Sequence, residues 1–167
     1  MMSVKKVTLA GLFTAVGVLC SAFYIPIGVA KAFPVQSFLN VLSAVILGPW
    51  YGLAMAFATS LLRNLLGTGS LLAFPGSMCG VLISAFLYKY TKKLAFAAFG
   101  EIIGTGIFGA FLAYPLAVAF LGSKGAAYIF VIPFAISAAV GSICSFFLLI
   151  ALDKSHVLQK MVLGEEL

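Results

Sequence analysis

Long apolar runs, separated only by short polar breaks, make up most of this chain. A helix that crosses a bilayer needs roughly 20 mostly apolar residues, and runs of about that length follow one another here. Only 8% of the residues are charged, against about 25% in soluble domains, so they cannot cover a water-facing surface. The sequence therefore predicts an all-α integral membrane protein and excludes a soluble domain, a disordered chain and a disulfide scaffold.

Prolines, glycines and lysines divide the apolar sequence into six predicted spans. The break at Gly48-Pro49 separates two helices, because proline inside a helix removes a hydrogen bond and clashes with the preceding turn. The helix before it is short, about 18 Å at 1.5 Å per residue, so five spans with one kinked helix are the alternative. We predict a single membrane domain, residues 1–167, with spans at 4–25, 36–47, 50–66, 74–88, 94–121 and 126–152, a loop at 26–34 and a tail at 153–167.

The distribution of basic residues favours six spans. With a cytoplasmic N-terminus, most of the bases then lie on the inner side, as the positive-inside rule requires. The inner group is Lys5, Lys6, Lys89, Lys92, Lys93, Lys154 and Lys160, and the outer group is Lys31, Arg63 and Lys124. Both termini are expected in the cytoplasm, and the chain is expected to cross the plasma membrane of a prokaryote several times. The net charge of +6 follows this pattern and forms no patch for nucleic acid.

Polar side chains recur at helical spacing inside the predicted spans. One group is Gln36, Asn40 and Ser43, and another is Ser60, Asn64 and Thr68. Residues three or four apart share one face of a helix. Side chains of this kind either contact a ligand or join transmembrane helices by hydrogen bonds, and the spacing alone leaves both interpretations open.

Two ionisable residues lie well inside apolar runs. Glu101 is roughly 10 Å from the nearest polar flank at 1.5 Å per residue, and Thr105 follows on the same helix face. A membrane-embedded acid indicates a functional site, with an interhelical hydrogen bond as the alternative. Arg63 is near a helix end, where its side chain can instead extend to the outer headgroups.

The sequence contains no recognisable catalytic or metal-binding set of residues. His156 is the sole histidine, and the three cysteines lie far apart inside apolar runs. The loop 67–70 lacks the Lys-Ser/Thr ending of a phosphate-binding loop. We therefore expect no enzymatic activity, no cofactor and no metal, and any ATP hydrolysis must come from another chain.

Small residues at four-residue spacing allow helices to approach closely. Gly100 and Gly104 are expected to serve internal packing. On the first span, Gly11 and Ala15 form a small-residue face that also suits docking onto the helices of another protein.

Three stretches resemble the substrate-binding S components of energy-coupling-factor vitamin transporters, and among these the thiazole-type ThiW family. They are KAFPVQ followed by Asn40, the segment from GPWYG to RNLLGTGSLLAFPGS (48–77), and the segment from GEIIGTG to AYP (100–115). The resemblance implies a small six-helix membrane protein that captures a thiamine precursor, hydroxyethylthiazole, outside the cell. It also implies a transmembrane coupling (T) protein and two cytoplasmic ATPases as partners, with docking through Gly11 and Ala15 or through Ala10 and Thr14.

A small neutral aromatic ligand needs a ring to stack on and a few polar partners. We expect these to come from Phe33, Gln36, Asn40, Asn64, Glu101, Thr105 and Tyr114. Tyr114 faces away from Glu101 in a straight helix and reaches the ligand only if the helix bends at Pro115. Three alternatives stay open: the pyrimidine half of thiamine or thiamine itself as the ligand, a structural membrane subunit without a ligand, and a membrane enzyme, for which the sequence offers no acids or metal ligands.

Overall fold

The computed structural model describes residues 4–27, 30–121 and 130–163, and helices make up most of them. The helices are α1 (Val4–Leu19), α2 (Pro34–Ile46), α3 (Pro49–Leu65), α4 (Ala73–Thr91), α5 (Leu94–Ile103), α6 (Ala110–Leu121), α7 (Val131–Lys154) and α8 (Val157–Leu163). A short 3-10 turn, Cys20–Ala22, extends α1. Helices thus lie in every segment that the sequence predicted as a span, and the start expected at residue 126 lies outside the described residues.

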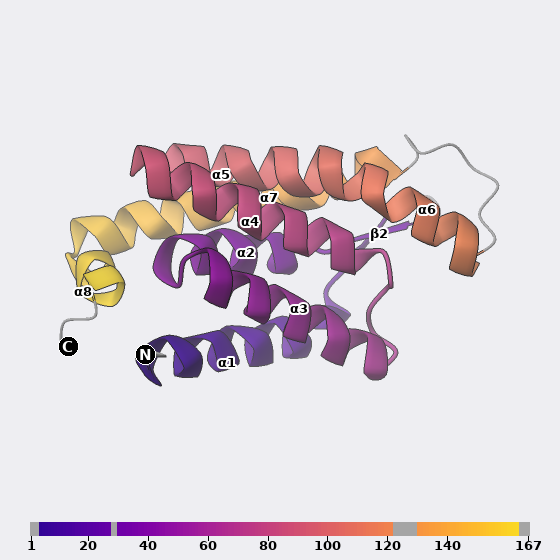
Figure 1. Cartoon of the computed structure of the whole chain (residues 1–167), viewed down its shortest axis with the longest axis horizontal. Helices are drawn as coiled ribbons and strands as arrows, with labels where there is room; N and C mark the ends of the chain where they lie inside the picture. The colour runs from indigo at the N-terminus through magenta and orange to yellow at the C-terminus, as the bar shows by residue number, and fades with distance from the viewer. Residues whose placement is uncertain (1–3, 28–29, 122–129, 164–167) are drawn as a thin grey trace.

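Three of the described helical stretches are long and apolar enough to cross a membrane: Val4–Ala22, Leu94–Phe120 and Val131–Lys154. The helical fold and these apolar stretches agree with the predicted class of all-α membrane protein. In Figure 1 the start of α1 and the short helix α8 lie at one end of the bundle, and β2 and the end of α3 lie at the opposite end.

The break between α2 and α3 is confirmed as a turn between two separate helices. Gly48 has a φ of +83°, a value that residues with a Cβ rarely adopt. Pro49 then occupies the first turn of α3, where its missing N–H costs nothing.

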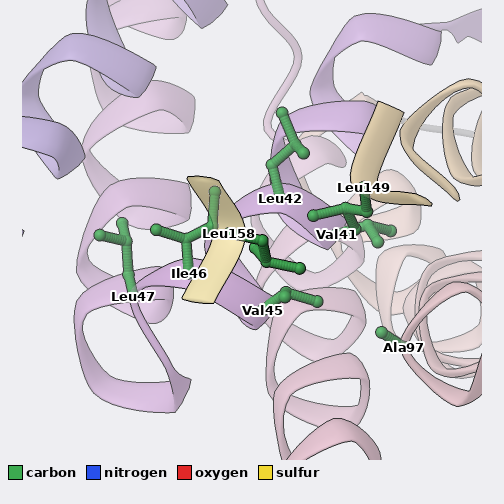
Figure 2. Packing of buried hydrophobic residues seen from close by; sticks show 8 residues of the cluster. All are labelled: Val41, Leu42, Val45, Ile46, Leu47, Ala97, Leu149 and Leu158. Atoms are coloured by element: carbon green, nitrogen blue, oxygen red, sulfur yellow. The ribbon is translucent and has the colours of Figure 1, made fainter. Parts of the chain in front are cut away.

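Helix α2 is short because it is surrounded by protein. Nearly all of its residues are buried, and it packs against α7, α4 and α5. The second half of α2 forms an apolar core with residues of α5, α7 and α8, and Figure 2 shows these residues as one cluster. The members of this cluster are Val41, Leu42, Val45, Ile46, Leu47, Ala97, Leu149 and Leu158. A helix that is buried all round does not face lipid, so its length need not match the hydrocarbon thickness.

The fifth predicted span is not one regular α-helix, as the sequence had suggested. A π-helical segment, Gly104–Gly109, separates α5 from α6. Small residues bring this segment against α4: a Cβ added at Gly104 would lie 2.7 Å from Gly80 Cα, and one at Gly109 would lie 2.5 Å from Gly76 Cα. Short π-helical segments inside α-helices are frequent at functional sites.

The connection after α1 also differs from the prediction. Helix α1 and its 3-10 extension end at Ala22, and the expected loop contains a small antiparallel hairpin of β1 (Ile25–Ile27) and β2 (Ala30–Ala32). Pro26 has no N–H to continue a helix, and pairing the two strands satisfies backbone groups that a loop would leave open. The hairpin leads the chain directly to the first turn of α2.

Candidate functional site

A cavity of about 410 Å³ is lined by residues of the hairpin strand β2 and of the helix ends near it. Its volume is within the range of about 300–1,000 Å³ that is typical of small-molecule sites. The walls come from β2, the first half of α2, the end of α3, the following loop, the starts of α4 and α7, and the π-helical segment. The lining residues are Lys31, Phe33, Gln36, Ser37, Asn40, Arg63, Asn64, Gly69, Ser70, Leu71, Leu72, Ala73, Gly76, Ser77, Thr105, Pro133, Phe134 and Ser137.

A chain of hydrogen bonds runs through this wall from α3 across α2 to α5. Arg63 Nη1 donates to Gln36 Oε1 at 3.0 Å, and Gln36 Nε2 donates to Asn40 Oδ1 at 3.3 Å. Asn40 Nδ2 then donates to Glu101 Oε1 at 3.0 Å, and the Thr105 hydroxyl lies 2.8 Å from the same oxygen. Five residues from four segments therefore form one connected polar network, which fixes the orientation of the two amides.

Arg63 is buried, so the interpretation that it extends to the lipid headgroups is wrong. Only 1% of its surface is exposed. The Phe33 ring covers its guanidinium, with the ring centroid 4.0 Å from Cζ. Its Nε and Nη2 find no hydrogen-bond partner among the described residues. The charge faces inward because the position falls on the side of α3 that packs against α2.

Glu101 lies behind the cavity wall and does not line the cavity itself. The side chain is fully buried, and a Cβ added at Gly80 would collide with its carboxylate and with the Thr105 hydroxyl. Glu101 Oε1 holds Asn40 and Thr105, both of which do line the cavity. Glu101 therefore contacts two residues of the cavity wall without belonging to the wall itself.

Phe33 sits where β2 meets α2 and joins the cavity to α7. Its backbone N–H donates to Ser137 Oγ at 3.1 Å, and Ser37 Oγ lies 3.4 Å from the same hydroxyl. Close packing makes this possible, because a Cβ added at Gly141 would meet the backbone of α2 at Phe38 N, 2.6 Å away. The aromatic ring is therefore held in a fixed position on the wall.

The loop after α3 closes one side of the cavity. Gly67 has a φ of +72° and turns the chain back, so that the N–H groups of Thr68 and Gly69 donate to Arg63 O. The amide Nδ2 of Asn64 donates to the carbonyl oxygens of Ser60 and Ser70. Asn64, predicted as a ligand-binding residue, lines the cavity, and its amide N–H groups order this loop.

Tyr114, which was expected to contact the ligand, is not among the described residues that line the cavity. Its side chain packs against an apolar cluster around α6, formed by Leu72, Ala110, Ala113, Ala117, Phe130 and Phe134. Two members of this cluster, Leu72 and Phe134, line the cavity, but Tyr114 does not. Pro115 lies inside α6 and does not bring Tyr114 round to the cavity. Phe33 remains the predicted stacking residue on the wall.

Comparison with known proteins agrees with this architecture. Residues 7–155 match a family described as thiamine-precursor transporter protein (ThiW). The chain belongs to the ThiW family. No curated protein matched the chain. ThiW membership makes the chain a membrane component of a thiamine-precursor transporter, a class of protein that handles a small molecule and is not an enzyme family.

The charges around the cavity of this ThiW protein are of one sign. Lys31 and Arg63 both line it, and no acid does among the described residues. Lys31 Nζ lies over the Tyr24 ring, 4.3 Å from the centroid. Glu101, the acid of the polar network, is linked to Arg63 only through the side chains of Gln36 and Asn40.

Sequence reasoning missed several of the residues that build this site. Ser137 is one, because a small residue in an apolar span suits close helix packing as well as a cavity wall. For Arg63 the sequence left two interpretations open, extension to the lipid headgroups or a place in a functional site. Its position one residue before Asn64 placed it beside a polar stripe. The small residues at the start of α4, Gly76 and Ser77, also line the cavity.

The exposed face of α1 carries Gly11 and Ala15. Ala15 is exposed, and a Cβ added at Gly11 would meet no atom within 4 Å among the described residues. Thr14 is buried and Ala10 packs against the apolar core, so these two residues serve the interior of the bundle.

Proposed function

We propose that the chain is the substrate-capture (S) subunit of an energy-coupling-factor importer for hydroxyethylthiazole. It binds this thiamine precursor on the extracellular side and delivers it inward, while partner ATPases hydrolyse ATP. The observation that supports this most is the cavity of about 410 Å³ with one aromatic wall and a fixed row of amides. Membership of a thiamine-precursor transporter family supplies the class of ligand.

The chemistry of the wall suits a small heteroaromatic ring. The ring is expected to stack beside Phe33, since aromatic pairs add about 0.5–1.5 kcal/mol beyond the area that they bury. Gln36 Nε2 carries two hydrogens and uses one on Asn40, so the second can donate to the thiazole nitrogen. Asn40 and Thr105 form the polar floor next to it.

The cavity charges favour hydroxyethylthiazole over thiamine itself. Thiamine is a cation, and Lys31 and Arg63 would repel it from a cavity that no acid lines among the described residues. A purely structural subunit is disfavoured because it has no use for a cavity of this size. The pyrimidine half of thiamine is neutral as well, so the binding test described below includes it as a competing compound.

Delivery requires coupling to other subunits. We propose that the membrane is crossed six times with both termini in the cytoplasm, which places the cavity on the outside. The exposed face with Gly11 and Ala15 would then meet the transmembrane coupling protein, because small residues allow close helix contact.

Thermal unfolding of the purified chain with each compound tests the ligand. A ligand that binds only the folded state stabilises it by about 2.7 kcal/mol at a hundred times its Kd. We expect hydroxyethylthiazole to raise the unfolding temperature and the variant Asn40→Leu to lose most of that rise. No rise with hydroxyethylthiazole, or a larger rise with the pyrimidine or with thiamine, would overturn the assigned ligand.

A further inference from the structure

The guanidinium of Arg63 has one edge that the protein does not use. Nη1 donates to Gln36, whereas Nε and Nη2 have no partner among the described residues although both atoms are buried. Nε and Nη2 point to the same side of a guanidinium, and together they form the edge that binds two oxygens of a carboxylate or phosphate in parallel.

The surroundings keep this edge free and positively charged. The Phe33 ring covers a face of the guanidinium, and a face contact takes up none of its N–H hydrogens. Among the described residues no carboxylate forms an ion pair with Arg63, and Glu101 is separated from it by two amide side chains. A buried, uncompensated charge is costly, so a counter-charge in the cavity would stabilise the site.

A second cation stands at the same cavity. Lys31 lines it from β2 and is itself exposed. Two cations around an enclosed space concentrate a field of one sign and attract anions. The polar residues on the other walls, Ser37, Ser70, Ser77 and Ser137, are neutral.

We propose that the cavity also accepts an anionic form of the precursor, a carboxylate or a phosphate ester, whose two oxygens Nε and Nη2 of Arg63 hold side-on. This inference rests on the proposed function: the ring remains that of the thiazole precursor, and its side chain ends in the anion. Lys31 neutralises remaining charge at the rim. Arg63 thereby becomes the residue that distinguishes an anionic precursor from the neutral alcohol.

The test compares three compounds on the purified wild-type chain by calorimetry: hydroxyethylthiazole, its phosphate monoester and a thiazole carboxylate. At least one anion is expected to bind about tenfold or more tightly than the alcohol, because bidentate charge-assisted bonds are roughly twice as strong as neutral ones. Its Kd is also expected to rise with ionic strength, whereas the Kd of the alcohol is not. Comparing the Kd values of the two anions shows whether the site prefers a phosphate or a carboxylate.

Variants assign the effect to the guanidinium edge. Arg63→Lys keeps the charge and removes the bidentate edge, so the anion should lose about tenfold in affinity and the alcohol much less. Lys89→Gln, which removes a charge from the exposed end of α4, is the control and should change neither value. If Arg63→Lys does not fold, the affinities of the three compounds for the wild-type chain, and their dependence on ionic strength, still test the proposal.

The failure of this inference differs from that of the proposed function. Binding of the alcohol as tightly as both anions would overturn the anion site and leave hydroxyethylthiazole transport in place. Binding of none of the three compounds to a folded chain would overturn both. Equal loss of all three ligands in Arg63→Lys would show that Arg63 only supports the structure.

Discussion

Replacing Gly104 with alanine tests the close approach of the π-helical segment to α4. The added Cβ would lie 2.7 Å from Gly80 Cα and 2.9 Å from Cys79 O. Nonbonded carbon atoms prefer about 3.5–4.0 Å, so the two segments must separate by about 1 Å. Both neighbours are backbone atoms, and no side-chain rotation can relieve the contact.

The cost follows from two opposing effects. Overpacking of this kind costs about 1–3 kcal/mol, and the better helix propensity of alanine offsets up to about 1 kcal/mol. A net loss of about 1–2 kcal/mol corresponds to a fall of roughly 2–8 °C in Tm for a chain of this length. Separation also breaks the hydrogen bond from Thr105 Oγ1 to Gly76 O, 3.0 Å long, so the precursor should bind more weakly.

Gly11→Ala is the matched control. It makes the same chemical change in an α-helix, but no atom of the described residues lies within 4 Å of the new Cβ. Its Tm should stay constant or rise. Both variants are followed in detergent by the intrinsic fluorescence of the chain during heating. Equal Tm values for Gly104→Ala and Gly11→Ala would refute the packing described for α4.

Three further variants probe the site and its coupling. Glu101→Gln should weaken precursor binding at least about tenfold, since it places an NH2 group, which cannot accept a hydrogen bond, beside the bonds to Asn40 and Thr105; an unchanged Kd in calorimetry would rule this out. Phe33→Leu should weaken binding about three- to tenfold through lost ring contact, and unaltered affinity would argue against stacking. Gly11→Leu should abolish uptake into cells while the Kd of the purified chain stays the same; normal uptake would exclude α1 as the docking face.

The helices could be predicted from local chemistry. The Gly48-Pro49 break separated α2 from α3 because a proline cannot continue a helix from the preceding turn. The spacing of Gln36 and Asn40 indicated a shared face, and both line the cavity. These features depend on residues close together in the chain, which the sequence displays directly.

The features of the fold and of the site that could not be predicted depend on contacts between residues that are distant in sequence. The distance of Arg63 from a helix end says nothing about whether it turns to lipid or to α2, and α2 decides this through Gln36. The π-helical segment arises where glycines of two helices meet, a contact between Gly104 and Gly80 that no single helix reveals. Tyr114 was predicted because an aromatic ring can stack on the ligand. In the structure it packs against the apolar cluster beside α6 and does not line the cavity.

The central claim is that this cavity holds a thiamine precursor. Mass spectrometry of the small molecules that co-purify with the chain, from cells supplied with isotope-labelled thiazole, tests it directly. We predict a labelled compound with a thiazole ring on the wild-type chain and its absence from a folded Asn40→Leu variant. A wild-type chain without labelled compound, or equal amounts on both proteins, would contradict the claim.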